Sequence, residues 1–296
     1  MTPDGRITSE FDDVLPDDDF HGDDRDGDDR DGEDRDGEDR DGDDRDGDDR
    51  DGDDLADLEL VVLDLAGTTV SDEGIVERAF ERAAAAAGIG STAEERADAF
   101  AFVRGAMGRP EIGVFRALTG DEDQAQHADA VFQSAYIELI RTEGVEPVPG
   151  AEELVRRLRA TGVSVALTSG VSRAALDAML DALGWQGLAD ITLTAAEAGR
   201  GRPFPDLPLT ALLRTGASTV EGMVVVGDTA GDIASGIAAG AGLVVGVLTG
   251  AHDEQSLLDA GADAVLPSVA DLPELLGYDS LIDEATAPEA LAHARR

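Results

Sequence analysis

The chain of 296 residues contains no cysteine and no lysine, because all 23 of its basic residues are arginine. Without cysteine it has no disulfide framework, no thiolate metal site and no cysteine nucleophile. Without lysine it has no side-chain amine that could form a Schiff base. The sequence also lacks an uninterrupted apolar run of about 18 residues, which a membrane-spanning helix requires.

Positive charge is scarce as well, since 65 acidic residues give a formal net charge of −42. Such a surface repels phosphate backbones and anionic lipid headgroups, so we expect neither a nucleic-acid partner nor a membrane partner. The polar start, residues 1–4, differs from signal and transit peptides, and we expect a cytoplasmic location. Two explanations of the acidity stay open: a high-salt cytosol, in which an acidic surface aids solubility, or a nucleotide composition that favours arginine codons.

Residues 1–54 hold 27 of the acidic residues and 7 arginines, and residues 22–54 repeat Asp, Arg and Gly with a period of five. With almost no apolar side chain to bury, this acidic tail is predicted to be disordered. A calcium-binding EF-hand loop is excluded by register, because a five-residue period places glycine at position 1 whenever it stands at position 6. Scavenging of divalent cations and binding of a partner are the alternatives to a purely solvated tail. Residues 279–296 are predicted to form a C-terminal tail.

From Leu58 onward, short apolar segments alternate with amphipathic segments. Strands are predicted at residues 58–63, 163–167, 191–193, 223–226 and 243–248. Helices are predicted at residues 150–161, 171–183, 206–215, 231–239 and 254–260. This pattern is typical of an α/β fold with a doubly wound, Rossmann-like parallel sheet covered on both faces. Ligands of such sheets bind at the carboxyl ends of the strands.

Residues 72–148 interrupt the alternation, because they contain only helical patterns. The predicted helices span residues 73–87, 93–107, 111–118 and 124–142, and a proline-rich hinge at 147–150 follows. We interpret this block as an all-helical cap domain inserted after the first strand, above the active-site edge. The core domain then comprises residues 55–71 and 149–278. The alternative is that these helices cover one face of the sheet.

Polar side chains stand at the ends of the predicted strands. They are Asp64 with the turn Gly67-Thr68, the run Thr168-Ser169-Gly170, Arg202, and the pair Asp228 and Asp232. Carboxylates at neighbouring strand ends can hold a hard cation such as Mg²⁺ while one of them attacks phosphorus. Arg202 and Thr168 can donate to phosphoryl oxygens, and the glycines Gly67 and Gly170 let backbone N–H groups approach them.

In this order, over about residues 57–278, the four motifs resemble the haloacid dehalogenase superfamily of aspartate-nucleophile phosphotransferases. The resemblance implies that Asp64 is the nucleophile. It implies that Mg²⁺ is held by Asp64, the backbone carbonyl of Ala66, Asp228 and Asp232. It also implies a phosphoryl site formed by Gly67, Thr68, Thr168, Ser169, Gly170 and Arg202, where Arg202 replaces the lysine of most members.

Ala66 departs from the pattern, since most phosphatases of the superfamily have a second aspartate at this position. A resemblance to the phosphonoacetaldehyde hydrolase branch is carried instead by Asp-x-Ala-Gly-Thr-Thr, Gly-Arg-Pro and the cap stretch 107–119. In that branch a cap lysine forms a Schiff base. Its members also pair through their caps, which implies a homodimer. That lysine position falls on Glu111, so the imine route is closed. We hypothesise that Glu111 supplies the missing acid and base, with its pKa raised under a closed cap. Alternatively, Glu111 is an ordinary first-turn helix acid.

The sequence thus predicts a Mg²⁺-dependent phosphohydrolase that acts on a small phosphorylated or phosphonate metabolite through an aspartyl-phosphate. Alternatives are a phosphoglycolate-phosphatase-like phosphomonoesterase, a metal-independent dehalogenase and a non-catalytic binding protein. The dehalogenase is disfavoured because Asp228 and Asp232 would repel Asp64 without a cation. Four further residues have either a site role or a solvated one: Arg104, Arg109, His127 and His252.

Overall fold

The computed structural model describes residues 58–71, 74–106 and 111–277, without the side chains at positions 104 and 105. The predicted acidic tail and C-terminal tail lie outside the described residues, as do Arg109 and the side chain of Arg104. Within the described ranges, no helix is both long and apolar enough to cross a membrane.

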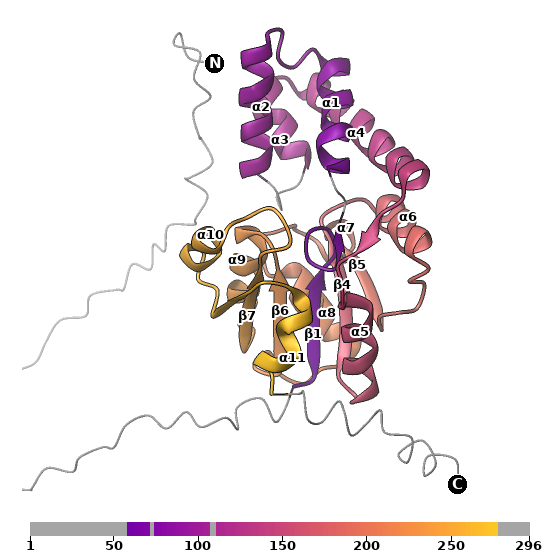
Figure 1. Cartoon of the computed structure of the whole chain (residues 1–296). Coiled ribbons are helices and arrows are strands. Elements are labelled where there is room, and N and C mark those ends of the chain that lie inside the picture. The colour runs from indigo at the N-terminus through magenta and orange to yellow at the C-terminus, as the bar shows by residue number, and fades with distance from the viewer. Residues whose placement is uncertain (1–57, 72–73, 107–110, 278–296) are drawn as a thin grey trace, which may run out of the picture. The chain divides into compact units, whose positions relative to one another are not determined.

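Six parallel strands form one sheet in the order β5-β4-β1-β6-β7-β8, and the strands labelled in Figure 1 lie side by side across the view. Their bounds are β1 Leu60–Asp64, β4 Ser164–Ser169, β5 Ile191–Thr194, β6 Met223–Gly227, β7 Leu243–Val247 and β8 Ala264–Leu266. The chain runs outward from β1 to β4 and β5, then returns past β1 to β6 and continues the other way. This reversal of strand order beside β1 is where ligands bind in doubly wound sheets.

Helices cover both faces of the sheet because successive strand residues point to opposite sides. Val61 and Leu63 pack into the core shared with α5, α6, the short 3₁₀ helix η1 and α11. Leu60 and Val62 pack on the other face against α8 and α9, and α10 lies beside α9. The bounds of these helices are α5 Ala151–Ala160, α6 Arg173–Leu183, η1 Val269–Asp271, α11 Leu272–Leu275, α8 Asp206–Thr215, α9 Ala230–Ala239 and α10 Glu254–Asp259.

Four further helices lie beyond the carboxyl ends of the strands and not against a face of the sheet (Figure 1). They are α1 Ile75–Ala87, α2 Ala93–Gly105, α3 Glu111–Thr119 and α4 Glu122–Glu143. A chain of ring contacts runs through α1, α3 and α4: Phe80 to Phe115 at 5.8 Å, Phe115 to Phe132 at 5.9 Å and Phe132 to Tyr136 at 5.7 Å between centroids. This placement supports a cap, and we propose residues 72–148 as its extent.

Several short elements differ from the expectations. The segment 72–148 is not purely helical, because β3 Glu146–Pro147 pairs antiparallel with β2 Val70–Ser71 where the cap joins the core. The helix α7 Ala195–Ala198 directly follows β5, and β8 is a sixth strand. Elements of two to four residues are too short to produce a detectable period. Asp64 and Thr168 also lie within their strands, not after them.

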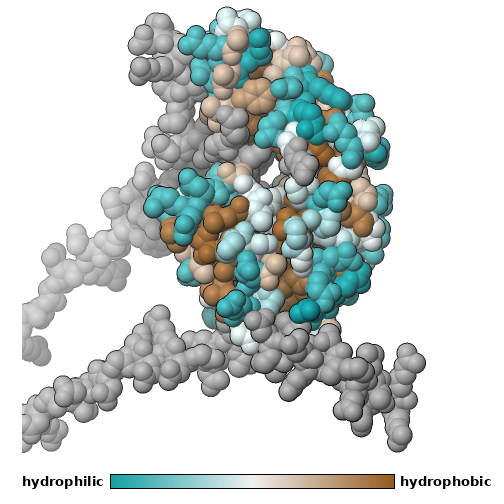
Figure 2. Space-filling view, viewed as in Figure 1, coloured by the Kyte–Doolittle hydropathy of each residue, from teal (hydrophilic) through white to brown (hydrophobic). Residues whose placement is uncertain are grey.

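Ion pairs on the surface join helices of the cap. Arg78 contacts Glu143 at 2.7 Å and Arg82 contacts Glu138 at 3.1 Å, so α1 is tied to α4 by charge as well as by packing. Figure 2 shows hydrophilic residues over much of one face, with hydrophobic residues exposed in patches on the core. The exposed ion pairs contribute little to stability, roughly 0–1 kcal/mol each. The buried apolar residues therefore provide most of the stability of the fold.

Two leucines on core helices test this distribution. Leu176 on α6 is fully buried, whereas Leu213 on α8 is 77 % exposed. We expect Leu176→Ala to lower the free energy of unfolding by about 2–5 kcal/mol, because it leaves a cavity. Leu213→Ala should change it by no more than about 0.5 kcal/mol. Urea denaturation measures both, and equal effects of the two variants would contradict the assignment of this core.

Candidate functional site

The site lies at the carboxyl edge of the sheet, where three neighbouring strands end. Asp64 is the last residue of β1 and lies in register with Thr168 of β4. Asp228 directly follows β6, the strand on the other side of β1. Because the strands are parallel, these side chains reach the same edge, although the chain separates both Thr168 and Asp228 from Asp64 by more than a hundred residues.

The turn after β1 brings backbone close to Asp228. Gly67 has φ of +85°, and a Cβ there would lie 2.4 Å from Oδ2 of Asp228. A Cβ on Gly250 would lie 2.0 Å from the same oxygen. The hydroxyl of Thr68 donates to Oδ1 of Asp228 at 3.0 Å, and the N–H of Ala251 donates to Oδ2 at 2.8 Å. Asp228 is therefore enclosed by backbone that only glycine permits and is held by two donors.

Asp232 lies in the first turn of α9, where a capping box holds it. The hydroxyl and the N–H of Thr229 both donate to its carboxylate, and the N–H of Asp232 donates back to the hydroxyl oxygen at 3.2 Å. His252 supports this helix start, because its Nδ1 accepts from the N–H of Ala230 at 2.9 Å. His252 thus lies beside the site without lining the cavity, whereas His127 is exposed on α4.

Arg202 lies between the acidic side chains. Its guanidinium donates to Oδ1 of Asp64 and forms an ion pair with Oδ1 of Asp232. It also reaches the hydroxyl oxygen of Thr168 at 3.4 Å, while that hydroxyl donates to the carbonyl of Leu63. The structure therefore brings together the five side chains that the sequence analysis placed at strand ends, including Asp228 beside Asp232.

Burial and crowding of like charges shape the ionisation of this group. Burial raises the pKa of Asp64 well above its usual value, and Asp232 and Asp228 add to this while Arg202 opposes it. Burial, with the charge of Asp232, raises the pKa of Asp228 to about 7. Burial alone would lower the pKa of Arg202, but Asp232 and Asp64 outweigh it and the pKa is raised.

Oxygen atoms of Asp64, Asp228 and Asp232 lie within 4.8 Å of one another. Three ionised carboxylates beside one guanidinium leave two negative charges in a buried place, which is costly unless a cation is present. An all-oxygen donor set with this surplus suits a hard divalent cation such as Mg²⁺. The residues present therefore fit the metal that the motifs predict.

A cavity of about 480 Å³ separates this group from the cap. The core side is lined by Asp64, Ala66, Gly67, Ser169, Gly170, Arg202, Asp228 and Asp232. The cap side is lined by Val76, Glu77, Phe80, Val103, Ala106, Glu111, Val114, Phe115, Phe132 and Tyr136. Thr68 and Thr168 do not line the cavity; they lie buried behind its wall and bond to Asp228 and Leu63.

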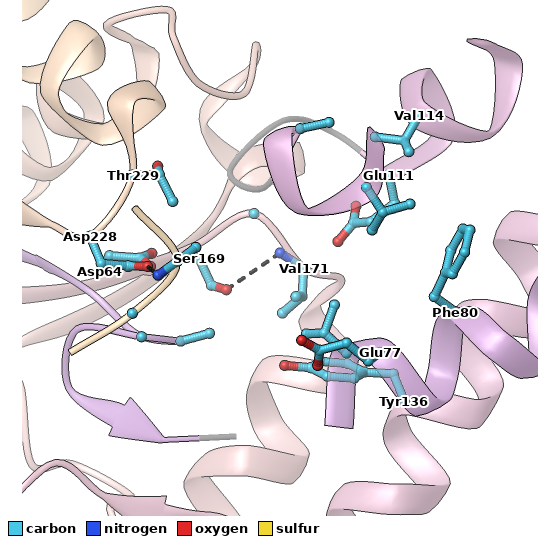
Figure 3. A pocket seen from close by; sticks show the side chains of 18 of the residues that line it. Asp64, Glu77, Phe80, Glu111, Val114, Tyr136, Ser169, Val171, Asp228 and Thr229 are labelled. Carbon is cyan, nitrogen blue, oxygen red and sulfur yellow. Dashed lines mark hydrogen bonds between the residues drawn. The ribbon is translucent and has the colours of Figure 1, made fainter. Parts of the chain in front are cut away.

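Glu111 is the first residue of α3, and its carboxylate points into the cavity (Figure 3). Burial raises the pKa of Glu111 to about 7, with the charge of Asp129 adding to the effect, while its own N–H and Arg202 oppose it. A carboxyl group with a pKa near neutrality can both give and take a proton at the pH of a cell. Glu77 and Tyr136 also face the cavity (Figure 3), although the sequence analysis singled out neither. They sit on amphipathic helices whose pattern predicts only a buried face.

Comparison with known proteins agrees with this geometry. The profile of the haloacid dehalogenase-like hydrolases matches residues 58–240. The chain belongs to this family. A phosphonoacetaldehyde hydrolase of Nitratidesulfovibrio vulgaris is 29 % identical over 244 residues, which cover 79 % of this chain and 84 % of that one.

Two solved structures share the fold of this haloacid dehalogenase-like hydrolase. A phosphonoacetaldehyde hydrolase like protein from Oleispira antarctica has a TM-score of 0.66 at 24 % identity and covers 79 % of this chain and 96 % of its own. A hydrolase from Pseudomonas syringae has a TM-score of 0.65 at 23 % identity and covers 75 % and 99 %. The doubly wound α/β fold predicted from the sequence is thereby confirmed.

The ion pairs of Arg202 make a prediction about stability. In metal-free buffer Arg202→Ala should lower the free energy of unfolding by about 3–5 kcal/mol, because it leaves buried carboxylates without their counter-charge. Arg156→Ala removes an exposed pair with Glu152 and should cost no more than about 1 kcal/mol. Thermal denaturation measures both variants. Added Mg²⁺ should restore part of the loss in Arg202→Ala; the absence of any recovery would argue against a cation site here.

Proposed function

We propose that this hydrolase is a Mg²⁺-dependent phosphohydrolase that cleaves small phosphorylated metabolites through an aspartyl-phosphate on Asp64. One observation carries the proposal: Asp64, Arg202, Asp228 and Asp232 converge on the core side of a cavity that the cap covers. A nucleophile, a cationic donor and an oxygen-rich cation site in one place are what phosphoryl transfer requires.

The roles of the residues follow from their positions. Oδ of Asp64 attacks phosphorus, since it ends β1 and lines the cavity. Arg202 touches both Asp64 and Thr168, so it is placed to donate to phosphoryl oxygens during the attack. Ser169 and the backbone at Gly170 line the same wall and offer further donors, whereas the N–H of Gly67 already donates to the carbonyl of Val70 at 2.8 Å. Positioned donors of this kind stabilise charge that grows in the transition state.

Asp64, Asp228 and Asp232, with the backbone carbonyl of Ala66, would hold the metal. When bound, Mg²⁺ would neutralise charge on the phosphoryl oxygens. The capping box of Asp232 and the two donors to Asp228 fix their carboxylates before any ligand arrives. A site organised in advance loses little free energy to reordering when it binds a cation.

Glu111 takes the place of the acid that Ala66 cannot supply. In the first step the bond from Asp64 to phosphorus forms, the bond from phosphorus to the leaving oxygen breaks, and that oxygen receives the proton of Glu111. In the second step water attacks phosphorus, its proton passes to the Glu111 carboxylate, and Asp64 leaves as a free carboxylate. A pKa of about 7 allows Glu111 to serve in both directions.

The absence of lysine favours phosphate esters over phosphonates as substrates. A carbon leaving group needs an electron sink, and the imine that provides one cannot form without an amine. Similarity to phosphonoacetaldehyde hydrolases therefore supports the fold and the hydrolase class of this chain more strongly than it supports phosphonoacetaldehyde as the substrate. A metal-independent dehalogenase is disfavoured, because three clustered carboxylates repel one another without a cation. Pairing of two copies through their caps stays a prediction.

Asp64→Asn tests the nucleophile. We expect hydrolysis of p-nitrophenyl phosphate and acetyl phosphate in Mg²⁺ to fall by about 10³-fold or more, because the amide cannot form the acyl phosphate. Asp177→Asn, an exposed change on α6, is the matched control. EDTA should abolish the activity of the wild-type protein and Mg²⁺ should restore it. Full turnover by Asp64→Asn, or in EDTA, would overturn the proposed mechanism.

The pH profile tests Glu111. With an alkyl phosphate, kcat/KM should fall as pH rises through about 7, since the ionised carboxylate has no proton for the leaving oxygen. Glu111→Gln should lower kcat/KM by about 10²-fold or more and remove this dependence. Acetyl phosphate, whose leaving group needs no proton, should respond far less. Glu94→Gln, exposed on α2, is the control, and an unaltered profile in Glu111→Gln would exclude Glu111 as the proton donor.

A further inference from the structure

Among the residues that the structure describes, the cap side of the cavity carries two carboxylates and no basic side chain. Glu77 on α1 and Glu111 on α3 both line it, and Figure 3 shows both carboxylates turned inward. Among the described residues, the one basic side chain in the lining is Arg202, which is already matched to Asp64 and Asp232. Neither Glu77 nor Glu111 forms an ion pair with any residue that the structure describes. The described part of the cap wall is therefore anionic.

The remaining cap residues of the cavity are apolar or aromatic. The rings of Phe80, Phe115, Phe132 and Tyr136 form a continuous series of contacts and all line the cavity. Aromatic rings attract cations through their π-electrons. A leaving group with a carboxylate or a second phosphate would be repelled by Glu77 and, once Glu111 has given up its proton, by a second carboxylate. A cationic leaving group would meet both an opposite charge and the rings.

We propose that the substrate is the phosphate ester of an amino alcohol, with its ammonium group against Glu77 and its phosphoryl group against Asp64. This inference rests on the proposed function and assigns the substrate class of the same site. Glu77 and Glu111 both line the cap side, opposite Asp64 and Arg202 on the core side. Because Glu111 is engaged with the leaving oxygen in the proposed mechanism, Glu77 is the carboxylate that can take the ammonium group. An ester a few atoms long then spans the cavity from core to cap.

The cation of such a substrate also assists the chemical step. When Glu111 gives its proton to the leaving oxygen, it becomes a carboxylate in a poorly solvated place, which is unfavourable by itself. An ammonium group a few ångströms away offsets that charge. The substrate would thus supply within its own leaving group the positive charge that no lysine of this chain can provide.

Two pairs of substrates test the inference, each pair matched in shape and differing in charge. Phosphoethanolamine is compared with propyl phosphate, and phosphocholine with 3,3-dimethylbutyl phosphate, with 2-phosphoglycolate as the anionic case. In Mg²⁺ the wild-type protein should show a kcat/KM roughly tenfold or more higher for the ammonium member of at least one pair, as an unscreened charged contact provides. 2-Phosphoglycolate should be the poorest substrate.

The side chain of Glu77 should carry the preference. Glu77→Gln should bring the ratio of the two kcat/KM values in that pair close to one, whereas Glu81→Gln, exposed one turn further along α1, should leave the ratio unchanged. A neutral ester as good as its ammonium partner in both pairs, or 2-phosphoglycolate as the best substrate, would overturn the inference. If p-nitrophenyl phosphate is hydrolysed without any such preference, the substrate class alone is wrong. If no phosphate ester or acyl phosphate is hydrolysed, the proposed function itself fails.

Discussion

Three carboxylates buried around one guanidinium are the constraint on which the site depends. Asp64 and Asp232 both bond to Arg202, and the charges of Asp232 and Asp228 add to the burial that raises the pKa of Asp64. Such an arrangement is unfavourable unless each charge is held and matched. The surrounding backbone, down to glycines that leave room for Asp228, is arranged around this requirement. The same surplus of negative charge makes the place suitable for a divalent cation.

The parallel sheet is what makes this concentration of charge possible. β1 ends with Asp64, β4 carries Thr168 next to its end, and Asp228 directly follows β6, so these residues reach one edge. The apolar faces packed by helices on both sides keep the strands in register. Loops alone would not hold three carboxylates together against their repulsion. The rigid core thus stores an unfavourable arrangement, and its stability elsewhere offsets the cost.

In the proposed mechanism the cap supplies the proton donor. Ala66 stands where a second aspartate is expected, and Glu111 of the cap lines the cavity in a setting that raises its pKa to about 7. Glu77 and the aromatic series line the same side of the cavity, and in our proposal they select the leaving group. Within one family, an unchanged core can therefore serve different substrates through the cap side chains that face it.

The sequence by itself determined the layers of the fold and the strand-end residues, because hydrophobic period and turn residues are local properties of the chain. Asp64, Thr168, Arg202, Asp228 and Asp232 were identifiable on that basis. It did not reveal the two-residue strands β2 and β3 or the cavity role of Glu77, since neither leaves a local signal. Only the tertiary structure decided that Thr68 and Thr168 lie behind the cavity wall and that Glu77 and Glu111 face it. The physical reason is that such positions depend on contacts between segments far apart in the chain.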